Sequence, residues 1–356
     1  MKLEIYQDSK GFEALQAEWN ALLQHSTTNV LFMTWEWQRA WWDTFGYAKN
    51  LRLFTVRDEK NSLVAICPLF FQRTSIDPTA PLPEISVERP HVIVGSEPRQ
   101  TMHLIGGTEV SDYLDIIASP EHHHGACAVL LNALAEEEDW QILDLRCLPA
   151  TSPTVQTISA LARDHGWNVQ QTREDVCPVV ELPRTWEEYL STRLDKKQRH
   201  ELRRKMRRAE QEAIVDWYWV TSENFEEGFK LFIQLHKASH PDKDAFMDER
   251  MQEFFHAIAH AALEKGWLRL SILRFNRYPV ASYLCFDYGG DRLVYNSGFD
   301  LSAYADLGPG IVLLGYLIDD AIRQGCRRFD FLQGGERYKY DFGARDTEVL
   351  RLFIQR

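Results

Sequence analysis

The sequence predicts a mixed α/β fold, with mixed sheets, that is divided into two domains. The chain has 356 residues, which exceeds one ordinary domain and suggests two of about 150 to 200 residues. Hydrophobic residues make up 45% of the chain and aromatic residues 12%, which is enough for two cores. The expected elements of the N-terminal half are strand, helices, strands, helix, strand, helix and strand, an order that resembles the one expected from Ile214 to the C-terminus. We therefore expect one domain over residues 1–180 and a second over residues 181–356.

The N-terminal half is predicted to begin with a strand over residues 2–7 and two helices. An apolar stripe at helical spacing from Phe12 to Leu23 marks the first helix, and Thr34 is in position to cap the second. Residues 74–110 are rich in Pro and Gly, so we expect loops with one or two short strands there. The other predicted elements are strands over residues 51–57, 62–71, 113–118 and 140–147, and helices over residues 121–137 and 155–165.

The C-terminal half is predicted to begin with a basic helix over about residues 186–212, followed by two helices within residues 221–265. An antiparallel meander comes next, with turns at Asn276-Arg277 and Gly289-Gly290-Asp291. Its strands are expected over residues 268–275, 280–288 and 293–299.

The tripeptide Gly308-Pro309-Gly310 opens the helix that follows the meander. Apolar residues recur at helical spacing up to Ile322, Gly325 is in place as a left-handed cap, and residues 328–332 form a short apolar strand. A glycine-containing helix start exposes backbone N–H groups and the positive end of the helix dipole, which favours a phosphate. The alternative interpretation is a helix-starting turn with no ligand, because proline is common at this position.

Three segments carry a resemblance to a known family: FMTWEWQRAWWDTFG, LDKKQRHELRRKMRRAE, and LGPGIVLLGYLIDDAIRQGCRRFDFLQGGERYKYDFG. Together they resemble acetyltransferases of the CelD/BcsL type, which belong to the GNAT superfamily and are related to Fem-type peptidoglycan aminoacyltransferases. The resemblance implies tandem GNAT-like domains. It implies a donor-binding C-terminal domain with its pyrophosphate on a helix N-terminus, between two splayed parallel strands. The N-terminal domain is expected to be degenerate, since no Gly-x-Gly loop precedes its helix over residues 121–137.

The same resemblance implies the residues of the site. The superfamily fingerprint begins with Arg or Gln, but this chain has Ala305 at that position, so one side-chain contact to phosphate is absent. Backbone N–H groups near Asn296 to Gly298 are expected to polarise the thioester carbonyl. The expected donor-binding residues are Asn296, Ser297, Leu307, Gly308, Gly310 and Ile311.

We expect catalysis from the loop that follows residues 328–332. Tyr338 or Tyr340 is the candidate to protonate the thiolate, and Glu336 is the candidate to accept the amine proton, directly or through water. Lys339 is expected to make a charge contact with substrate or donor. His236 is either an acceptor-side base or a core histidine.

The basic helix leaves two interpretations open. It is either a solvated face that balances an acidic protein, or an electrostatic platform for an anion such as the CoA 3′-phosphate, a nucleotide-sugar acceptor or tRNA. The net charge of −12 and the pI near 5.5 argue against general nucleic-acid binding over the whole surface.

Other expectations concern what the chain does not need. No apolar run approaches about 18 residues, so no membrane span is expected, and residues 1–16 do not read as a signal peptide. The six cysteines include no Cys-x-x-Cys pair, which fits reduced thiols in a cytoplasmic protein. The run His122-His123-His124 points its side chains in different directions on a helix, so no metal is expected.

The sequence thus predicts an N-acyltransferase that uses acetyl-CoA or another acyl-CoA as co-substrate. Its acceptor would be an amine on a small molecule, an amino sugar or a polysaccharide precursor. Two alternatives stand beside it: a Fem-like transferase that uses aminoacyl-tRNA, and a non-catalytic binding protein that retains the fold.

Overall fold

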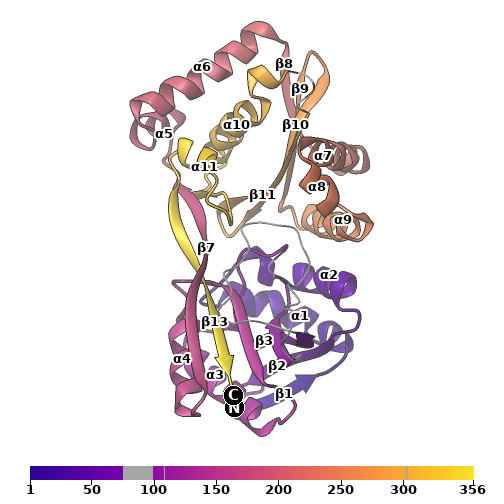
Figure 1. The fold of residues 1–356 in the computed structure, drawn as a ribbon, viewed down its shortest axis with the longest axis vertical. Coiled ribbons are helices and arrows are strands. Elements are labelled where there is room, and N and C mark those ends of the chain that lie inside the picture. Colours follow the sequence, from indigo (N-terminus) through magenta and orange to yellow (C-terminus); the bar gives the residue numbers. More distant parts are fainter. Residues whose placement is uncertain (75–98, 108, 301, 303) are drawn as a thin grey trace. The chain divides into compact units, whose positions relative to one another are not determined.

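A computed structural model describes residues 1–74, 99–107, 109–300, 302 and 304–356. The chain forms two compact units (Figure 1): the N-terminal unit comprises Met1–Asp175 and Glu348–Arg356, and the C-terminal unit comprises Val176–Thr347. Both units combine helices with a mixed sheet, which confirms the predicted mixed α/β fold. Most of the loop segment expected over residues 74–110 lies outside the described residues.

In the N-terminal unit the strand order is β1-β2-β3-β4-β6-β13. Strands β4 and β6 are parallel, and α3 connects them. The predicted cap at Thr34 is confirmed, because its hydroxyl accepts the N–H of Trp37 at the start of α2. The elements are β1 (Lys2–Tyr6), α1 (Lys10–Gln24), η1 (Leu31–Met33), α2 (Trp35–Phe45), β2 (Asn50–Arg57), β3 (Leu63–Thr74), β4 (Arg99–Leu104), β5 (Ile117–Ala118), α3 (His123–Glu136), β6 (Ile142–Pro149), α4 (Pro153–Asp164) and β7 (Asn168–Glu181).

The strand predicted over residues 113–118 is wrong for its first four residues. Only Ile117 and Ala118 pair with β3, as β5. The buried Asp115 bends the segment, since its carboxylate accepts the N–H of Ile116 and the hydroxyl of Ser152, at 2.7 and 2.5 Å. A buried carboxylate must find such donors, so its hydrogen bonds prevail over strand propensity.

In the C-terminal unit the strand order is β7-β12-β11-β10-β9-β8. Helices α6 and α10 pack on one face of this sheet, and α7 and α9 pack on the other (Figure 1). The elements are α5 (Trp186–Thr192), α6 (Lys196–Glu212), β8 (Val215–Trp219), α7 (Phe225–Ser239), α8 (Pro241–Phe246), α9 (Glu249–Glu264), β9 (Leu268–Phe275), β10 (Tyr278–Tyr288), β11 (Asp291–Phe299), η2 (Ala305–Leu307), α10 (Pro309–Arg323), β12 (Arg328–Asp330), α11 (Arg337–Asp341) and β13 (Arg345–Gln355).

The single basic helix predicted over residues 186–212 is two helices, α5 and α6. Asp195 separates them, because its carboxylate accepts the N–H of Gln198 while the Gln198 side chain accepts the N–H of Asp195. This reciprocal capping box starts a new helix at Lys196.

The last strand of each half of the chain pairs in the unit of the other half. Residues Val179–Glu181 of β7 pair antiparallel with β12 in the C-terminal unit. Residues Val349–Gln355 of β13 pair antiparallel with β6 in the N-terminal unit. The buried side chain of Arg351 on β13 makes two hydrogen bonds to Asp144 on β6, at 2.6 and 3.1 Å. The segment that forms β13 was not expected to be a strand from the sequence.

Candidate functional site

The parallel strands β11 and β12 pair over a short length and then separate. Asp291–Leu293 pair with Arg328–Asp330, whereas β11 continues to Phe299. Leu332 has a φ of +57° and its N–H donates to the Asp330 carboxylate at 2.8 Å, which turns the chain away at the end of β12. Beyond Leu293, β11 therefore has an edge that β12 does not cover, as the resemblance implies for splayed strands.

The start of α10 presents free backbone N–H groups. The N–H groups of Leu307 and Gly308 are used within the preceding turn, donating to Tyr304 and Ala305. The first helical residue is Pro309, which has no N–H. Among the described residues, no acceptor contacts the N–H groups of Gly310 and Ile311. Of the four expected donor-binding positions in this loop, these two therefore offer their amides to an anion.

Gly310 is required by its contact with β11. A Cβ on Gly310 would lie 2.6 Å from the Cε1 atom of Phe299. The Phe299 ring therefore lies directly against the first turn of α10, and it packs edge-on to the ring of Tyr283. These contacts join the uncovered edge of β11 to the free amides of α10.

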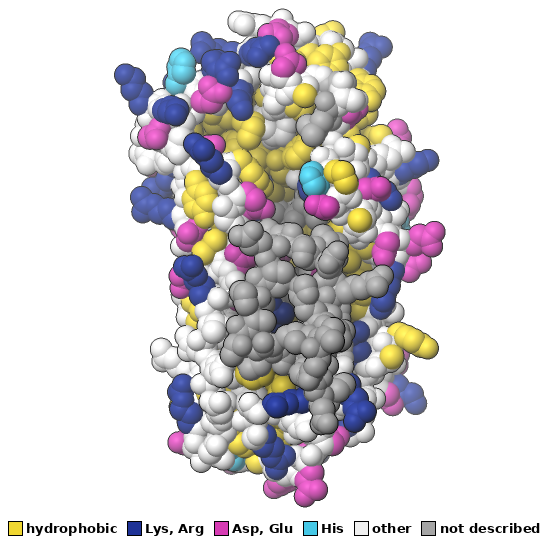
Figure 2. Space-filling model, in the orientation of Figure 1, with side chains coloured by type: hydrophobic (Ala, Val, Ile, Leu, Met, Phe, Trp, Pro, Cys, Tyr) yellow, Lys and Arg dark blue, Asp and Glu magenta, His cyan; other side chains and the backbone are white. Residues whose placement is uncertain are grey.

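One cation of the basic helix α6 reaches this helix start. A Cβ on Gly308 would lie 3.8 Å from the ammonium of Lys205, which has no ion-pair partner among the described residues. By contrast, other arginines of α6 are paired with Glu187, Glu201, Glu212 or Asp306. Figure 2 shows Lys and Arg side chains gathered over α6 and hydrophobic side chains over α10 and α11.

The loop after β12 is held by Lys339. This side chain is only 2% exposed, and its ammonium donates to the carbonyls of Leu332, Gln333 and Gly334 at 3.2, 2.7 and 2.9 Å. It also pairs with the Glu336 carboxylate at 2.9 Å. All three N–H groups of the ammonium thus have acceptors within the loop.

Replacing Lys339 by methionine is expected to destabilise the C-terminal unit. The change leaves three carbonyls and one carboxylate without their donor, which should cost about 3 kcal/mol. For a unit of this size that corresponds to a fall in melting temperature of about 6–12 °C, measured by differential scanning calorimetry. The exposed neighbour Arg337→Met is the control, and an equal fall in both variants would contradict the assigned role of Lys339.

Tyr338 and Glu336 lie together at the start of α11. Burial raises the pKa of the Tyr338 hydroxyl, and the nearby Glu336 charge adds to the rise. That hydroxyl has no hydrogen-bond partner among the described residues, whereas the Tyr340 hydroxyl donates to Asp346 at 2.7 Å. Of the two tyrosines considered from the sequence, Tyr338 is therefore the one whose hydroxyl has no hydrogen-bond partner among the described residues.

Two side chains, one from α7 and one from α8, converge on one carbonyl of β11. His236, at the end of α7, places Nδ1 3.0 Å from the Ser297 carbonyl oxygen, and the Lys243 ammonium donates to the same oxygen at 2.7 Å. The N–H of Ser297 donates to the Asn296 side chain at 2.8 Å. Gly298 makes this closeness possible, because a Cβ there would lie 2.2 Å from the backbone N of His236.

Lys243 was not singled out from the sequence. It lies in the short helix α8, where no periodic pattern or motif marks it. Burial lowers its pKa to about 8, against the opposing charge of Glu336. His236, which was considered as either a base or a core residue, is 1% exposed, and its Nε2 is buried without a hydrogen-bond partner among the described residues.

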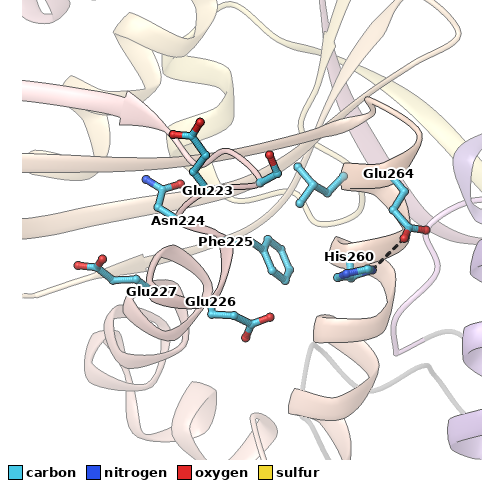
Figure 3. A pocket seen from close by; sticks show the side chains of 9 residues that line it. Glu223, Asn224, Phe225, Glu226, Glu227, His260 and Glu264 are labelled. Atoms are coloured by element: carbon cyan, nitrogen blue, oxygen red, sulfur yellow. Dashed lines mark ion pairs between the residues drawn. The ribbon is translucent and has the colours of Figure 1, made fainter.

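A separate pocket of about 620 Å³ lies at the N-terminus of α7 and the C-terminal part of α9. Four glutamates, Glu223, Glu226, Glu227 and Glu264, line it together with His260, whose ring faces Glu264 at 3.8 Å (Figure 3). It lies at the opposite end of α7 from His236, about 16 Å along the helix axis. Its carboxylates would repel a phosphate, so this pocket does not fit an anionic donor.

In the N-terminal unit, the strand edge that corresponds to the uncovered edge of β11 is occupied by another segment of the chain. Strands β4 and β6 pair only through Thr101–His103 and Ile142–Asp144. Beyond that pairing, the N–H of Leu114 donates to the Cys147 carbonyl at 2.9 Å. The buried segment around Leu114 therefore occupies the edge of β6 that follows the parallel pairing.

Two further properties concern ions and membranes. Within the described ranges, no three His, Cys, Asp or Glu side chains gather closely enough to hold a metal ion. None of the helices in the described part of the chain is long and apolar enough to cross a membrane.

Comparisons with known proteins concern the family of the C-terminal part and the fold of the chain. Residues 196–340 match the family Acetyltransf_6, described as an acetyltransferase (GNAT) domain. A search of curated proteins by sequence gives no match. The fold is similar to the crystal structure of FemX, with a TM-score of 0.63, 12% identity, and coverage of 99% of this chain and 96% of that chain. It is also similar to L-PGS from Bacillus licheniformis, with a TM-score of 0.55, 12% identity, and coverage of 98% and 92%.

The matched segment begins at the first residue of α6 and ends within α11, so it contains the start of α10, the separating strands, Lys243 and Tyr338. The C-terminal part of the chain therefore carries an acetyltransferase (GNAT) domain. The presence of this domain indicates that the protein is an acyltransferase.

Proposed function

We propose that the chain transfers an acyl group, with acetyl-CoA as the expected donor, to an amine on a small molecule, an amino sugar or a polysaccharide precursor. The observation that carries the proposal is the pair of free amides at Gly310 and Ile311, next to the edge of β11 that β12 leaves uncovered. Amides at a helix N-terminus stabilise a pyrophosphate, and an open strand edge offers hydrogen bonds to the amide groups of a pantetheine arm.

Lys205 strengthens this assignment. The superfamily fingerprint has a side chain that contacts phosphate where this chain has Ala305. The Lys205 ammonium approaches the same loop from α6, next to Gly308. We assign it the role of the missing phosphate contact. Among the described residues of the N-terminal unit, the segment around Leu114 occupies the edge of β6 that follows its pairing with β4, which supports donor binding by the C-terminal unit.

In the proposed reaction the chain positions the thioester and manages its charges. The N–H of Ser297 donates to the thioester carbonyl once the Asn296 side chain moves aside, which stabilises the developing oxyanion. The Tyr338 hydroxyl donates a proton to the departing thiolate. Lys339 positions the loop that carries Tyr338 and Glu336, in place of the substrate contact expected from the sequence.

A thermal-shift panel of acetyl-CoA, longer acyl-CoA esters and free CoA tests the proposal. A ligand present at about 100 times its dissociation constant should raise the melting temperature on the order of 5 °C. The absence of a shift with every CoA ester would contradict an acyl-CoA donor.

The Lys205→Glu variant is expected to bind the stabilising ester about tenfold more weakly, equivalent to about 1.4 kcal/mol. The matched control is Lys197→Glu, an exposed lysine on the same helix about 12 Å away along the axis. Isothermal titration calorimetry at two salt concentrations checks this result. Equal weakening in both variants would indicate a general charge effect without a local phosphate contact.

A second candidate is transfer from aminoacyl-tRNA. The similarity to FemX and the cations along α6 favour it, because a polyanion needs such an extended basic face. In that case ribonuclease should abolish activity in a coupled assay, and aminoacyl-tRNA should stabilise the protein where CoA esters do not.

A further inference from the structure

His236 and Lys243 hold the Ser297 carbonyl from two directions, and this arrangement has a consequence for Lys243. The Lys243 ammonium contacts the Ser297 carbonyl oxygen at 2.7 Å and the Ser297 hydroxyl oxygen at 3.4 Å. It has no carboxylate within ion-pair distance among the described residues. Burial of an ammonium without a counter-ion disfavours the charged form, so the neutral amine becomes accessible closer to neutral pH than in a free lysine.

A neutral amine can satisfy both of these contacts. Neutral lysine has two N–H donors and one lone pair. Both atoms of Ser297 that contact Nζ are acceptors and use the two donors. The remaining tetrahedral position then carries the lone pair, and no described residue contacts Nζ there.

The position of Lys243 places that lone pair within the proposed site. Its Nζ atom lies 5.6 Å from the centre of the Phe299 ring, which packs against Gly310. It also faces the charge of Glu336 at the start of α11, beside Tyr338. Lys243 is therefore close to the Phe299 ring, which packs on the helix start that would hold the pyrophosphate, and within the electrostatic reach of Glu336.

The charged groups around Lys243 leave it free to titrate. Burial lowers the pKa of Lys243 to about 8, although the charge of Glu336, which precedes α11, opposes this shift. His236 on α7 is neutral at physiological pH, because burial lowers its pKa to about 4. The carboxylates of α8 itself are engaged elsewhere: Asp242 with His240 at 3.3 Å and Asp244 with Lys237 at 3.0 Å.

We propose that Lys243 is the base that takes the proton from the acceptor amine, and that His236 is a positioning residue that fixes the Ser297 carbonyl to which Lys243 is bound. The inference rests on the proposed N-acyl transfer, but it does not depend on which of the two donors is used.

The neutral acceptor amine forms a C–N bond to the thioester carbonyl carbon, and its N–H proton passes to the Lys243 lone pair. The C–S bond breaks with its electron pair on sulfur, which takes a proton from the Tyr338 hydroxyl. Lys243 then returns its proton to solvent and Tyr338 regains one, so that the products are the amide and CoA–SH.

The decisive comparison is between Lys243→Arg and Lys243→Met. Arginine keeps the positive charge but cannot act as a base at these pH values. We expect both variants to lose about 100-fold or more in kcat, which is typical for a lost general base, while the thermal shift by the donor is retained. In the wild type, kcat/KM should rise with pH through about 8, because only the neutral amine accepts a proton. Both variants should lose this inflection.

Three results would overturn the inference. Lys243→Arg activity within threefold of the wild type, with Lys243→Met inactive, would show that the charge matters instead, as expected for pairing with an anionic acceptor. An unchanged inflection in both variants would assign it to another group. A Lys243 pKa near 10, measured by NMR on lysines labelled by reductive ¹³C-methylation, would exclude a neutral amine without any activity assay. If no donor stabilises the wild type, that result counts against the proposed function. The pKa of Lys243 measured by NMR then decides separately whether Lys243 can be a neutral base.

Discussion

Replacing Gly310 by glutamate is expected to lower the affinity for the acyl-CoA donor at least about 100-fold, which corresponds to about 2.7 kcal/mol. The new Cβ would lie 2.6 Å from the Phe299 ring, so the ring or the start of α10 must move. The added carboxylate would also place a negative charge beside the amides that we assign to the pyrophosphate. Isothermal titration calorimetry with acetyl-CoA measures the loss.

Two further variants separate the steric from the electrostatic contribution. Gly325→Glu makes the same substitution at the other end of α10, where a side chain would meet open space, and should leave donor affinity unchanged despite its local φ strain. The double variant Gly310→Ala with Phe299→Leu restores room without adding charge, and should bind better than Gly310→Ala alone. Binding by Gly310→Glu within threefold of the wild type would exclude this helix start as the donor site.

Replacing Arg351 by methionine is expected to destabilise the N-terminal unit by about 3–5 kcal/mol. Arg351 on β13 is 6% exposed and Asp144 on β6 is 2% exposed, so the change leaves a buried carboxylate without its main partner. The melting temperature of this unit should fall by about 10 °C or more, as measured by calorimetry.

A second ion pair that involves β13 provides a matched control. Arg173 pairs with Glu348 of β13 at 3.4 Å, but both side chains are largely exposed, so Arg173→Met should cost no more than about 1 kcal/mol. The double variant Arg351→Met with Asp144→Leu should recover most of the lost stability, since it removes the unpaired charge. If Arg351→Met and Arg173→Met have the same effect, then this ion pair does not anchor β13.

The sequence predicted best those features that depend on neighbours along the chain. The cap at Thr34 is confirmed because a hydroxyl and an N–H three residues apart meet in any helix start. The turn at Asn276-Arg277 is confirmed by positive φ at both residues, as a two-residue hairpin requires. The prediction of one continuous basic helix was wrong at Asp195. There a capping box starts a new helix, although the amphipathic pattern continues through this position.

The residues of the candidate site also differ in how far the local sequence could predict them. Gly310 and Ile311 follow from the local chemistry of a helix start, and the structure leaves their amides free. Lys339 also matched a motif, but its environment is set by carbonyls that only the folded loop brings together. Lys243 has no mark in the sequence, since 54 residues separate it from the Ser297 carbonyl that it contacts.

By itself, the sequence determined the mixed α/β class, the helix start at Gly308-Pro309-Gly310 and the resemblance to acetyltransferases. These follow from residue periodicity, capping and motifs, which act over a few residues. Only the tertiary structure decided that β7 and β13 complete the sheets of the opposite halves, and that His236 and Lys243 meet at one carbonyl of β11. Strand partners and convergent side chains depend on contacts between distant segments, and many pairings of similar apolar strands satisfy the same local pattern until the whole chain is packed.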